Sequence, residues 1–491
     1  MRNVRRDRID AAGGLLFPFV VALLGFVVIA PSLRTGWYAD DAYYWALPGW
    51  LALRHESLLA IMQHAFALWL FGNARFYPGL VVEKFWVFAT FTDVLAYKWL
   101  LIVLTLVAVE LFRRCVAVYA SLGVANLAAL VVCAILQERA YHDALLAYNG
   151  MPQVVAIAVL LSLLAFAGAG TGRRTVAFVL AVVAGLTYEE VYAFGLLYLA
   201  LARTRTPSWA VALRRAAPFL ALSALLMALG VALHLAFPPH GSYALSLAPV
   251  PLLVAAFDQV AAAFPLVYWA ADPNGIFGRS SLDDFWRNAP VDPLLVAAFA
   301  VAAWVALRRL DDAARAGPLA AIGALVVLLL AAPVAILVKY QHELRLGLGY
   351  LPVFGEYFGA ALILVAVCLA ARGRFPRVAP VVGAVAIGLV AAMTQATNVR
   401  VVRELEPDAV AQRAFIQALR HGLVAGVAEN ATVATRTAEP WLEPDGTGPE
   451  GISVAGLFYA YAHARVRVVS VSVHPDVVLE YDPADARWRR R

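Results

Sequence analysis

Charged residues are scarce in this sequence. Only 15% of its 491 residues are Asp, Glu, Lys or Arg, whereas 63% are hydrophobic. Soluble proteins carry about 25% charged residues, so the composition excludes an ordinary soluble chain. Apolar runs of about 17 to 25 residues, long enough to span a bilayer, recur along most of the sequence. The sequence therefore predicts a polytopic membrane protein.

Cysteine is also scarce. Cys115, Cys133 and Cys368 are the three cysteines, and no two of them stand at a short spacing. Disulfide frameworks and zinc sites need such pairs, so we expect these side chains to pack as small apolar groups. The sequence has no Gly-rich nucleotide loop, internal repeat or heptad run. Its basic residues are scattered among short loops, which argues against a nucleic-acid partner.

The positions of the basic residues predict how the helices are oriented. Cytoplasmic loops are enriched in Lys and Arg, and four arginines precede the first apolar run, about Gly14–Leu33. That run lacks a nearby small-residue cleavage site, so we expect an uncleaved helix with a cytoplasmic N-terminus. Further spans are expected at about 98–112, 117–136, 152–169, 175–202 as two short helices, 218–237, 293–307, 318–338, 351–371 and 380–394. This places every short basic loop inside and the C-terminus outside.

The run Thr175–Ala202 is predicted to be a hairpin. Glu189 and Glu190 interrupt it, and arginine clusters lie at both of its ends. A charge at the bilayer centre costs several kcal/mol. Two short helices with the acids at an outer apex avoid that cost and keep both arginine clusters inside.

Two long outer loops, 34–97 and 238–291, each contain an apolar stretch that we expect to lie on the outer surface. Leu58–Phe71 is short for a span. If Pro249–Ala270 crossed the bilayer, the basic loop that follows it would lie outside.

The last part of the chain is less apolar and predicts a small separate domain. A helix is expected near Pro407–Val427 and strands near Ala431–Thr437 and Arg465–Val473. The expected fold is therefore an all-α polytopic membrane module, residues 1–396, with about eleven transmembrane helices and juxtamembrane helices on the outer face. A small extracytoplasmic α/β domain, residues 397–491, follows it.

Polar clusters gather on the predicted outer face. Asp40 and Asp41 follow the first helix and are flanked by Trp and Tyr, which favour the membrane interface. The other candidate site residues are Arg75, Tyr77, His142, Asp143, Tyr188, Glu189, Glu190, Lys339, His342 and Arg345. The middles of the predicted helices carry almost no charge, whereas transporters place charges near the bilayer midplane. This distribution favours an enzyme.

Three of these clusters resemble the pattern of the GT-C superfamily of membrane glycosyltransferases, which includes protein mannosyltransferases and aminoarabinose transferases. The matches are the carboxylate pair after the first helix, the Arg75–Pro78 segment late in the same loop, and the acidic hairpin tip. They fall within about 14–394. Family members often carry Asp-Glu where this chain has Asp40-Asp41, which leaves open which Asp is the important one.

The resemblance implies transfer of a sugar from a polyprenyl-phosphate carrier to a glycan, lipid or protein acceptor, on the outer face of a bacterial cytoplasmic membrane. The acceptor hydroxyl needs a base, which a carboxylate supplies, and the departing phosphate needs cations. By the resemblance, Asp40 is the expected base and Asp41 the alternative. Arg75 would hold the phosphate together with Lys339, His342 or Arg345. Carboxylates also bind Mg²⁺ or Mn²⁺, so metal-dependent and metal-free transfer both fit.

Two other functions fit the same composition. O-antigen ligases and polymerases are also polytopic, but their chemistry centres on Arg and His in a late large loop, whereas the acid pair here comes first. A flippase or transporter of lipid-linked sugars should line an interior path with charges.

Overall fold

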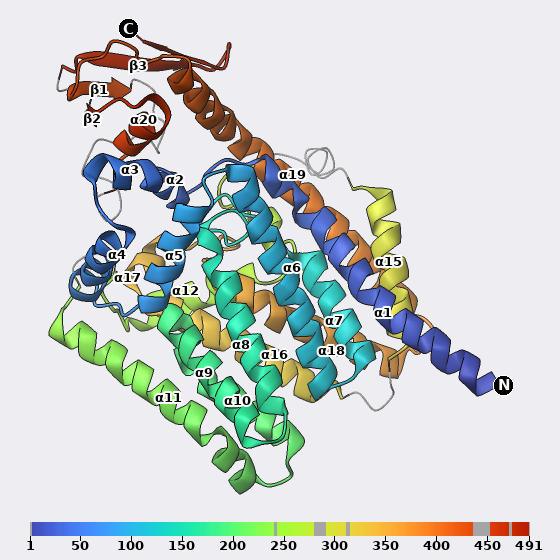
Figure 1. The fold of residues 1–491 in the computed structure, drawn as a ribbon. Coiled ribbons are helices and arrows are strands. Elements are labelled where there is room, and N and C mark those ends of the chain that lie inside the picture. Colours follow the sequence, from blue (N-terminus) through green and yellow to red (C-terminus); the bar gives the residue numbers. More distant parts are fainter. Residues whose placement is uncertain are drawn as a thin grey trace.

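The computed structural model of the chain describes residues 2–239, 243–278, 291–310, 315–435, 452–470 and 474–490, and for residues 2–15 the backbone alone. Within these ranges the chain is a bundle of helices with a small sheet at one end (Figure 1). We call the end of the bundle that carries Asp41, Arg75 and Glu189 the site face and the opposite end the basic face.

In the part of the chain that the structure describes, seven helices are long and apolar enough to cross a membrane. They are α1 (Arg2–Ile29), α6 (Val94–Tyr119), α8 (Met151–Ala167), α11 (Trp209–Ala236), α16 (Ala316–Ala335), α18 (Val353–Arg374) and α19 (Ala379–Arg420). The four other predicted spans form shorter helices, α7 (Leu122–Ile135), α9 (Thr171–Thr187), α10 (Gly195–Arg205) and α15 (Pro293–Arg308). Among the described residues, a helix therefore lies at each of the spans that the sequence predicts.

Local sequence signals account for several helix starts. Asp93 accepts a hydrogen bond from the Ala96 amide at 2.9 Å and caps α6. Asp292 does the same for the Leu294 amide of α15 at 2.8 Å. These side chains satisfy amides that have no partner within the helix. Ser121 occupies the corresponding position before α7.

The predicted hairpin is present as α9, the 3-10 helix η4 (Glu189–Phe194) and α10. Shorter helices cover the site face: α2 (Asp41–Tyr44), α3 (Leu47–Arg54), α4 (Leu58–Ala67), α5 (Pro78–Thr90), α12 (Pro249–Ala262), α13 (Val267–Ala271) and α17 (Val338–Glu343), with the turns η1 (Ala30–Arg34), η2 (Leu68–Gly72) and η3 (Tyr148–Gly150). The predicted surface stretch at Pro249–Ala270 is broken into α12 and α13.

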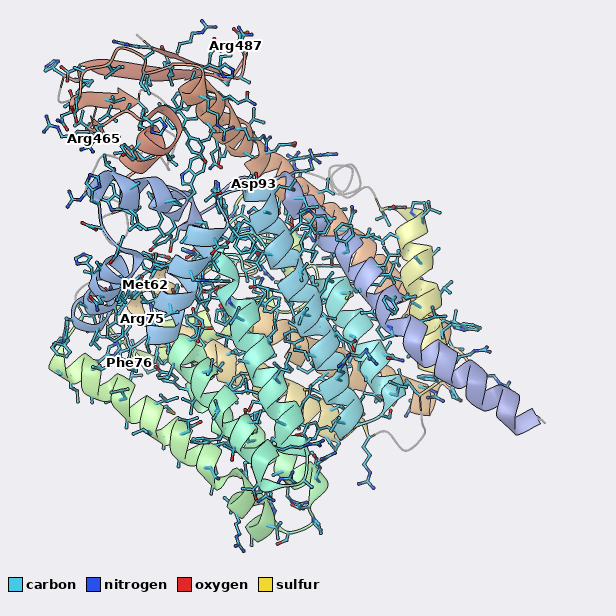
Figure 2. All side chains as sticks on the ribbon, viewed as in Figure 1. Met62, Arg75, Phe76, Asp93, Arg465 and Arg487 are labelled. Atoms are coloured by element: carbon cyan, nitrogen blue, oxygen red, sulfur yellow. The ribbon has the colours of Figure 1, made fainter. Side chains whose placement is uncertain are left out.

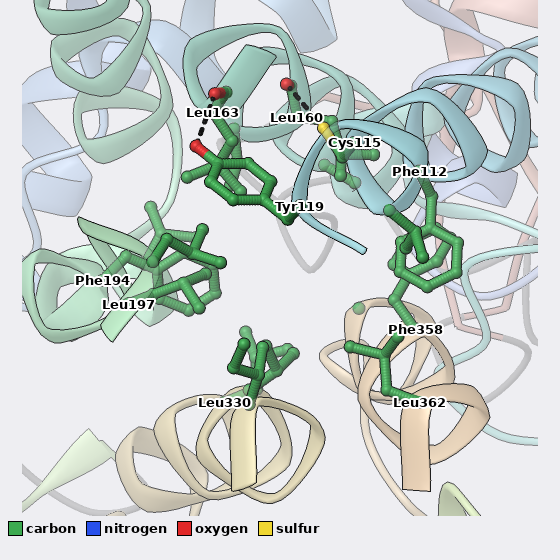
Figure 3. A pocket seen from close by; sticks show the side chains of 18 of the residues that line it. Phe112, Cys115, Tyr119, Leu160, Leu163, Phe194, Leu197, Leu330, Phe358 and Leu362 are labelled. Atoms are coloured by element: carbon green, nitrogen blue, oxygen red, sulfur yellow. Dashed lines mark hydrogen bonds between the residues drawn. The ribbon is translucent and has the colours of Figure 1, made fainter. Parts of the chain in front are cut away.

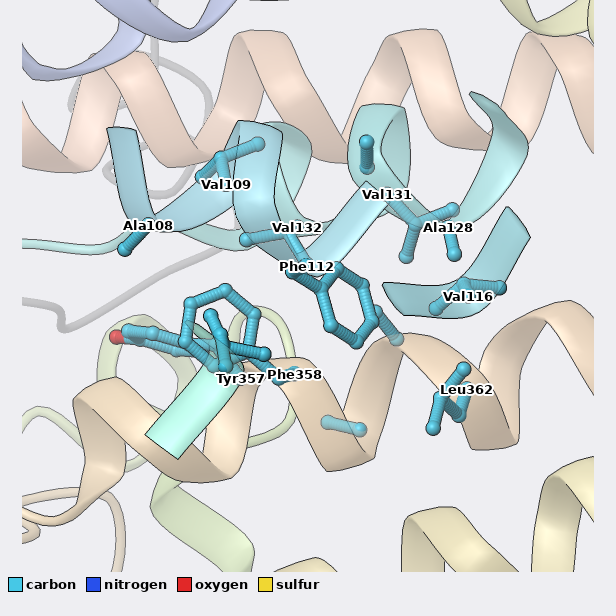
Figure 4. Packing of buried hydrophobic residues seen from close by; sticks show 14 of the residues in the cluster. Ala108, Val109, Phe112, Val116, Ala128, Val131, Val132, Tyr357, Phe358 and Leu362 are labelled. Atoms are coloured by element: carbon cyan, nitrogen blue, oxygen red, sulfur yellow. The ribbon is translucent and has the colours of Figure 1, made fainter. Parts of the chain in front are cut away.

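The core of the bundle is built from large apolar side chains and close glycine contacts. Figure 4 shows Phe112 of α6 against Phe358 of α18, and their ring centroids are 4.9 Å apart. Between α16 and α18, a Cβ added to Gly323 would lie 2.5 Å from the Gly359 carbonyl oxygen. Small residues of this kind let transmembrane helices approach closely.

The C-terminal part differs from the prediction in one respect. The helix expected near Pro407–Val427 is not separate, because α19 continues from the last span without a break to Arg420. Val401, Val402 and Ala409 are buried along this extension, so packing maintains the helix where hydropathy falls. The strands β1 (Ala431–Thr435), β2 (Val466–Val468), β3 (Val477–Asp482) and β4 (Arg487–Arg490) form a sheet of order β2-β1-β3-β4, and α20 (Ala455–Ala462) packs on α3. The division of the chain near residue 396 stays a prediction.

Candidate active site

Arg75 lies at the centre of a first group of polar residues on the site face, between α4 and α5 (Figure 2). Its buried guanidinium donates a hydrogen bond to the Glu189 carboxylate. It also lies over the rings of Trp69, Tyr77 and Tyr243, at 5.7, 4.6 and 5.1 Å from their centroids. Burial lowers the pKa of Arg75, but the Glu189 charge, Tyr77 and the hydrogen bond to Glu189 together raise that pKa well above its usual range. The guanidinium is therefore a permanent cation in an aromatic enclosure.

Two lysines extend the positive charge around Arg75. The Lys84 ammonium lies 5.8 Å from the centre of the Trp69 ring, which Arg75 also contacts. The Lys339 ammonium lies 5.9 Å from the centre of the Tyr243 ring. Each lysine thus shares an aromatic neighbour with Arg75, and the three cations come from three separate segments of the chain.

Asp41 is the centre of a second group. Its carboxylate is 1% exposed and accepts hydrogen bonds from the Tyr97 hydroxyl and, at 3.0 Å, from the Tyr148 amide. Burial raises the pKa of Asp41 to about 7, although Tyr97 and the Lys98 charge act in the opposite direction.

The Asp41 group holds a stretch of unusual backbone. Tyr148, Asn149 and Gly150 have φ angles of 70°, 51° and 85°. The Asn149 amide donates to the Tyr97 hydroxyl at 2.9 Å, and the Asn149 side chain donates to the Glu83 carboxylate. Left-handed backbone at residues other than glycine is strained and is concentrated at functional sites. Carboxylates from α2 and α5 hold this stretch in place.

Asp40 has different surroundings from its neighbour Asp41. Asp40 is exposed, whereas Asp41 is buried. Burial raises the pKa of Tyr243, the Arg75 charge lowers it, and the Asp40 charge raises it. Since Tyr243 lies against Arg75, the charge of Asp40 acts on the Arg75 group. Asp41, in contrast, is hydrogen-bonded to Tyr97 and to the 148–150 stretch.

His142 lies between the two groups. Its ring centroid is 5.4 Å from that of Tyr148 and 5.3 Å from that of Tyr350. Burial and the positive charge of Lys339 lower the pKa of His142 to about 3, so its imidazole is neutral at physiological pH. Asp143 accepts a hydrogen bond from the Leu145 amide at 2.8 Å and forms an ion pair with Arg139, which indicates a role in holding its own loop.

An apolar cavity of about 740 Å³ opens next to the Arg75 group. Figure 3 shows side chains of α6, α8, α10, α16 and α18 around it, among them Phe112, Leu160 and Leu330. Tyr188 and Glu190 line the end of the cavity near the site face, and the Tyr188 and Tyr77 ring centroids are 6.1 Å apart. Burial raises the pKa of Glu190 well above its usual range. A carboxyl group that resists ionisation is compatible with an apolar ligand.

The structure does not bring every candidate residue together. His342 and Arg345 are exposed, and Arg345 lines a separate open hollow together with Arg400 and Glu404. Within the described residues, no group of three or more His, Cys, Asp or Glu side chains is placed to hold a metal ion.

Sequence reasoning missed several residues of the site. Glu83, Lys84 and Lys98 are charged residues within apolar helices, and that rarity is the signal that could have found them. Tyr243 and the strained Tyr148 gave no such signal, because their importance depends on contacts with residues far away in the sequence.

Comparisons with known proteins identify no family. No protein-family model matches the sequence, and no curated protein matches it. Two solved structures of ArnT from Cupriavidus metallidurans align with nearly the whole chain. The apo structure is 15% identical with a TM-score of 0.39 and covers 97% of this chain and 94% of that chain. The structure bound to undecaprenyl phosphate is 14% identical with a TM-score of 0.38, and the coverages are 96% and 93%. Because the identities and TM-scores are this low, the function of this chain has to be argued from its own residues.

Proposed function

We propose that this protein is a membrane glycosyltransferase that moves a sugar from a polyprenyl-phosphate carrier to a glycan, lipid or protein acceptor. The observation that carries the proposal is that the buried Arg75 enclosure adjoins, through the Tyr77 and Tyr188 rings, the end of an apolar cavity. A lipid phosphate has a long apolar chain and a compact anion, and its site needs an apolar space that ends at cations. Arg is suited to the anion because its forked donors match phosphate oxygens.

The carrier phosphate binds at Arg75, with Lys84 and Lys339 close enough to add to the positive field. In the structure Arg75 donates a hydrogen bond to the Glu189 carboxylate. The incoming phosphate therefore either displaces Glu189 from Arg75 or binds to Arg75 beside it. The lipid chain lies in the cavity beside Glu190. As the bond between the sugar and the phosphate breaks, negative charge grows on the phosphate, and the three preorganised cations stabilise it.

A carboxylate takes the proton of the acceptor hydroxyl as that oxygen attacks the anomeric carbon. Asp40 is the proposed base, because it is exposed and its charge acts on a residue that touches Arg75. Asp41 is buried and already accepts two hydrogen bonds, so its proposed role is to hold the 148–150 stretch in place.

The decisive experiment measures sugar transfer by purified variants from purified polyprenyl-phosphate-linked sugars, with and without a chelator. Asp40→Asn should lower turnover by a factor of about 10² to 10⁴, the typical effect of losing a general base. Asp41→Asn should cost less, unless the acids bind a metal, in which case both losses are severe and activity depends on added Mg²⁺ or Mn²⁺.

The matched control is Glu56→Gln, which removes an exposed acid of the same loop that pairs only weakly with Arg54 at 3.5 Å. Near-normal rates for both aspartate variants would contradict the glycosyltransferase assignment. A transporter would keep moving lipid-linked sugar after Asp40→Asn, so the same variant separates the two functions.

A further inference from the structure

We propose that the apolar cavity has a second, basic mouth that binds the phosphate of an anionic phospholipid, with the acyl chains of that lipid in the cavity. This site is at the opposite end of the cavity from Arg75. The binding of the phospholipid does not depend on the proposed glycosyltransferase function.

The length of the cavity is the first reason. Its lining follows α16 from Arg315 to Leu330 and α10 as far as Thr204. Fifteen residue steps of helix correspond to about 22 Å, compared with about 30 Å for the hydrocarbon core of a bilayer. The cavity therefore runs through most of the bundle and reaches the basic face.

The charge of the far mouth is the second reason. Arg203 and Arg315 line this end, together with Ser121 and Thr204, and the described lining has no acid here. Within the described ranges, Arg203 donates one hydrogen bond, to the Thr206 carbonyl at 2.9 Å, and its guanidinium lies 5.2 Å from the centre of the Trp209 ring. Basic pockets between transmembrane helices are suited to anionic lipid headgroups.

Neighbouring arginines strengthen the positive field at this mouth. Arg205 donates to the Ala167 carbonyl and Arg215 to the Phe166 carbonyl, each at 2.6 Å. Both hydrogen bonds cap the end of α8. Because their acceptors are neutral carbonyl groups, the positive charges of the two arginines still add to the field at the mouth. A phosphate here meets two lining arginines and two more behind them.

The apolar walls of the cavity are suited to the acyl chains of a lipid. Side chains such as Phe194, Leu197 and Leu362 surround the space with few polar atoms (Figure 3). A soluble phosphate compound would leave this volume unfilled. An anionic phospholipid fills the apolar volume and neutralises the arginines at the same time.

Native mass spectrometry of the full-length protein tests the site. The protein is extracted from bilayers of phosphatidylglycerol or of phosphatidylcholine, with no polyprenyl phosphate present. We expect one phosphatidylglycerol to remain bound and phosphatidylcholine to be lost. The double variant Arg203→Gln/Arg315→Gln should retain at least about fivefold less phosphatidylglycerol, roughly 1 kcal/mol of binding free energy.

The control is Arg374→Gln/Arg377→Gln, which removes two exposed charges of the basic face that do not line the cavity. A third variant, Leu197→Trp, fills the cavity and leaves the mouth charges intact. We expect Leu197→Trp to abolish the retention of phosphatidylglycerol. Equal retention of both lipids, unchanged retention in the double variant, or full retention in Leu197→Trp would each overturn the proposal.

Competition between the two ligands is a consequence that does rest on the proposed function. A polyprenyl phosphate bound at Arg75 would occupy the same apolar space, so it should displace phosphatidylglycerol. Binding of phosphatidylglycerol as expected, without its displacement by polyprenyl phosphate, would support the phospholipid site. The same result would contradict the proposal that the lipid chain of the carrier lies in this cavity.

Discussion

At the scale of single residues, the adjacent aspartates Asp40 and Asp41 differ in their exposure to solvent. Asp40 is the residue before α2 and Asp41 is its first residue, so the chain turns by about 100° between them. One side chain stays exposed and the other is buried against Tyr97. This separation lets one short segment supply both a carboxylate for the substrate and a carboxylate that holds the backbone.

The buried carboxylate should make stability depend on pH. The folded pKa of Asp41, about 7, lies above the usual value of 3.8. A raised folded pKa gives a stabilising contribution that is complete below about pH 4 and is lost as the pH rises through 7. We therefore expect wild-type protein to lose unfolding free energy between about pH 4 and pH 7 relative to Asp41→Asn. Thermal unfolding of both proteins across this range measures the difference, and parallel curves would contradict the raised pKa.

The Arg75 enclosure gives a second prediction at this scale. Arg75→Lys keeps the positive charge but loses the forked donors and part of the contact with the Tyr77 ring. We expect weaker binding of the polyprenyl-phosphate donor, by about 1 to 3 kcal/mol, measured as a higher KM for the donor. Arg54→Lys, at an exposed arginine over Trp50, serves as the control. Unchanged KM and turnover in Arg75→Lys would reduce Arg75 to a structural anchor.

At the scale of elements, the α9–η4–α10 hairpin places its acids at a turn between two helices. The sequence predicts that this turn lies on the extracytoplasmic face of the membrane. Glu189→Cys should therefore react with a membrane-impermeant thiol reagent added to intact cells. Arg174→Cys, at an exposed position on the basic face, should react only after permeabilisation. The reverse pattern would show that the predicted orientation is wrong.

Local pattern and long-range contact explain which elements could be predicted. Each helix of the bundle carries its own hydropathy signal, and the acids of η4 stand out because charges are rare in apolar runs. The carboxylate of Asp41, in contrast, meets Tyr97 and Tyr148, which are 56 and 107 residues away. No local pattern encodes such pairings. For the same reason the exposure of Arg345, away from Arg75, could not be seen in the sequence.

At the scale of the whole molecule, the C-terminal sheet and the membrane bundle are joined at the Asp40–Asp41 segment. The Gln412 side chain on α19 accepts a hydrogen bond from the Trp37 amide and donates one to the Trp37 carbonyl, both at 2.8 Å. A Cβ at Gly456 of α20 would lie 2.5 Å from the Ala46 carbonyl oxygen. The C-terminal part thus helps to fix the position of the proposed base.

This contact predicts the effect of a small substitution where α3 packs on α20. In Gly49→Ala, the new methyl group would overlap the backbone carbonyl of Gly456, so α3 and α20 must separate. Overpacking of this kind costs about 1 to 3 kcal/mol, and we expect a lower unfolding temperature and reduced transfer. Gly172→Ala is the control, because no atom lies within 4 Å of the added methyl group. Equal stability of the two variants would contradict a tight contact between the parts.

The unbroken length of α19 links the last membrane span to the backbone next to the proposed base. Its 42 residues correspond to about 63 Å of helix, roughly twice the thickness of the hydrocarbon core. The part of the helix beyond the span carries Gln412, which holds the backbone of Trp37, shortly before Asp40. A tilt of the last span in the bilayer would therefore be transmitted along one rigid rod to the Asp40 segment, so this architecture couples the site to the lipid around that span.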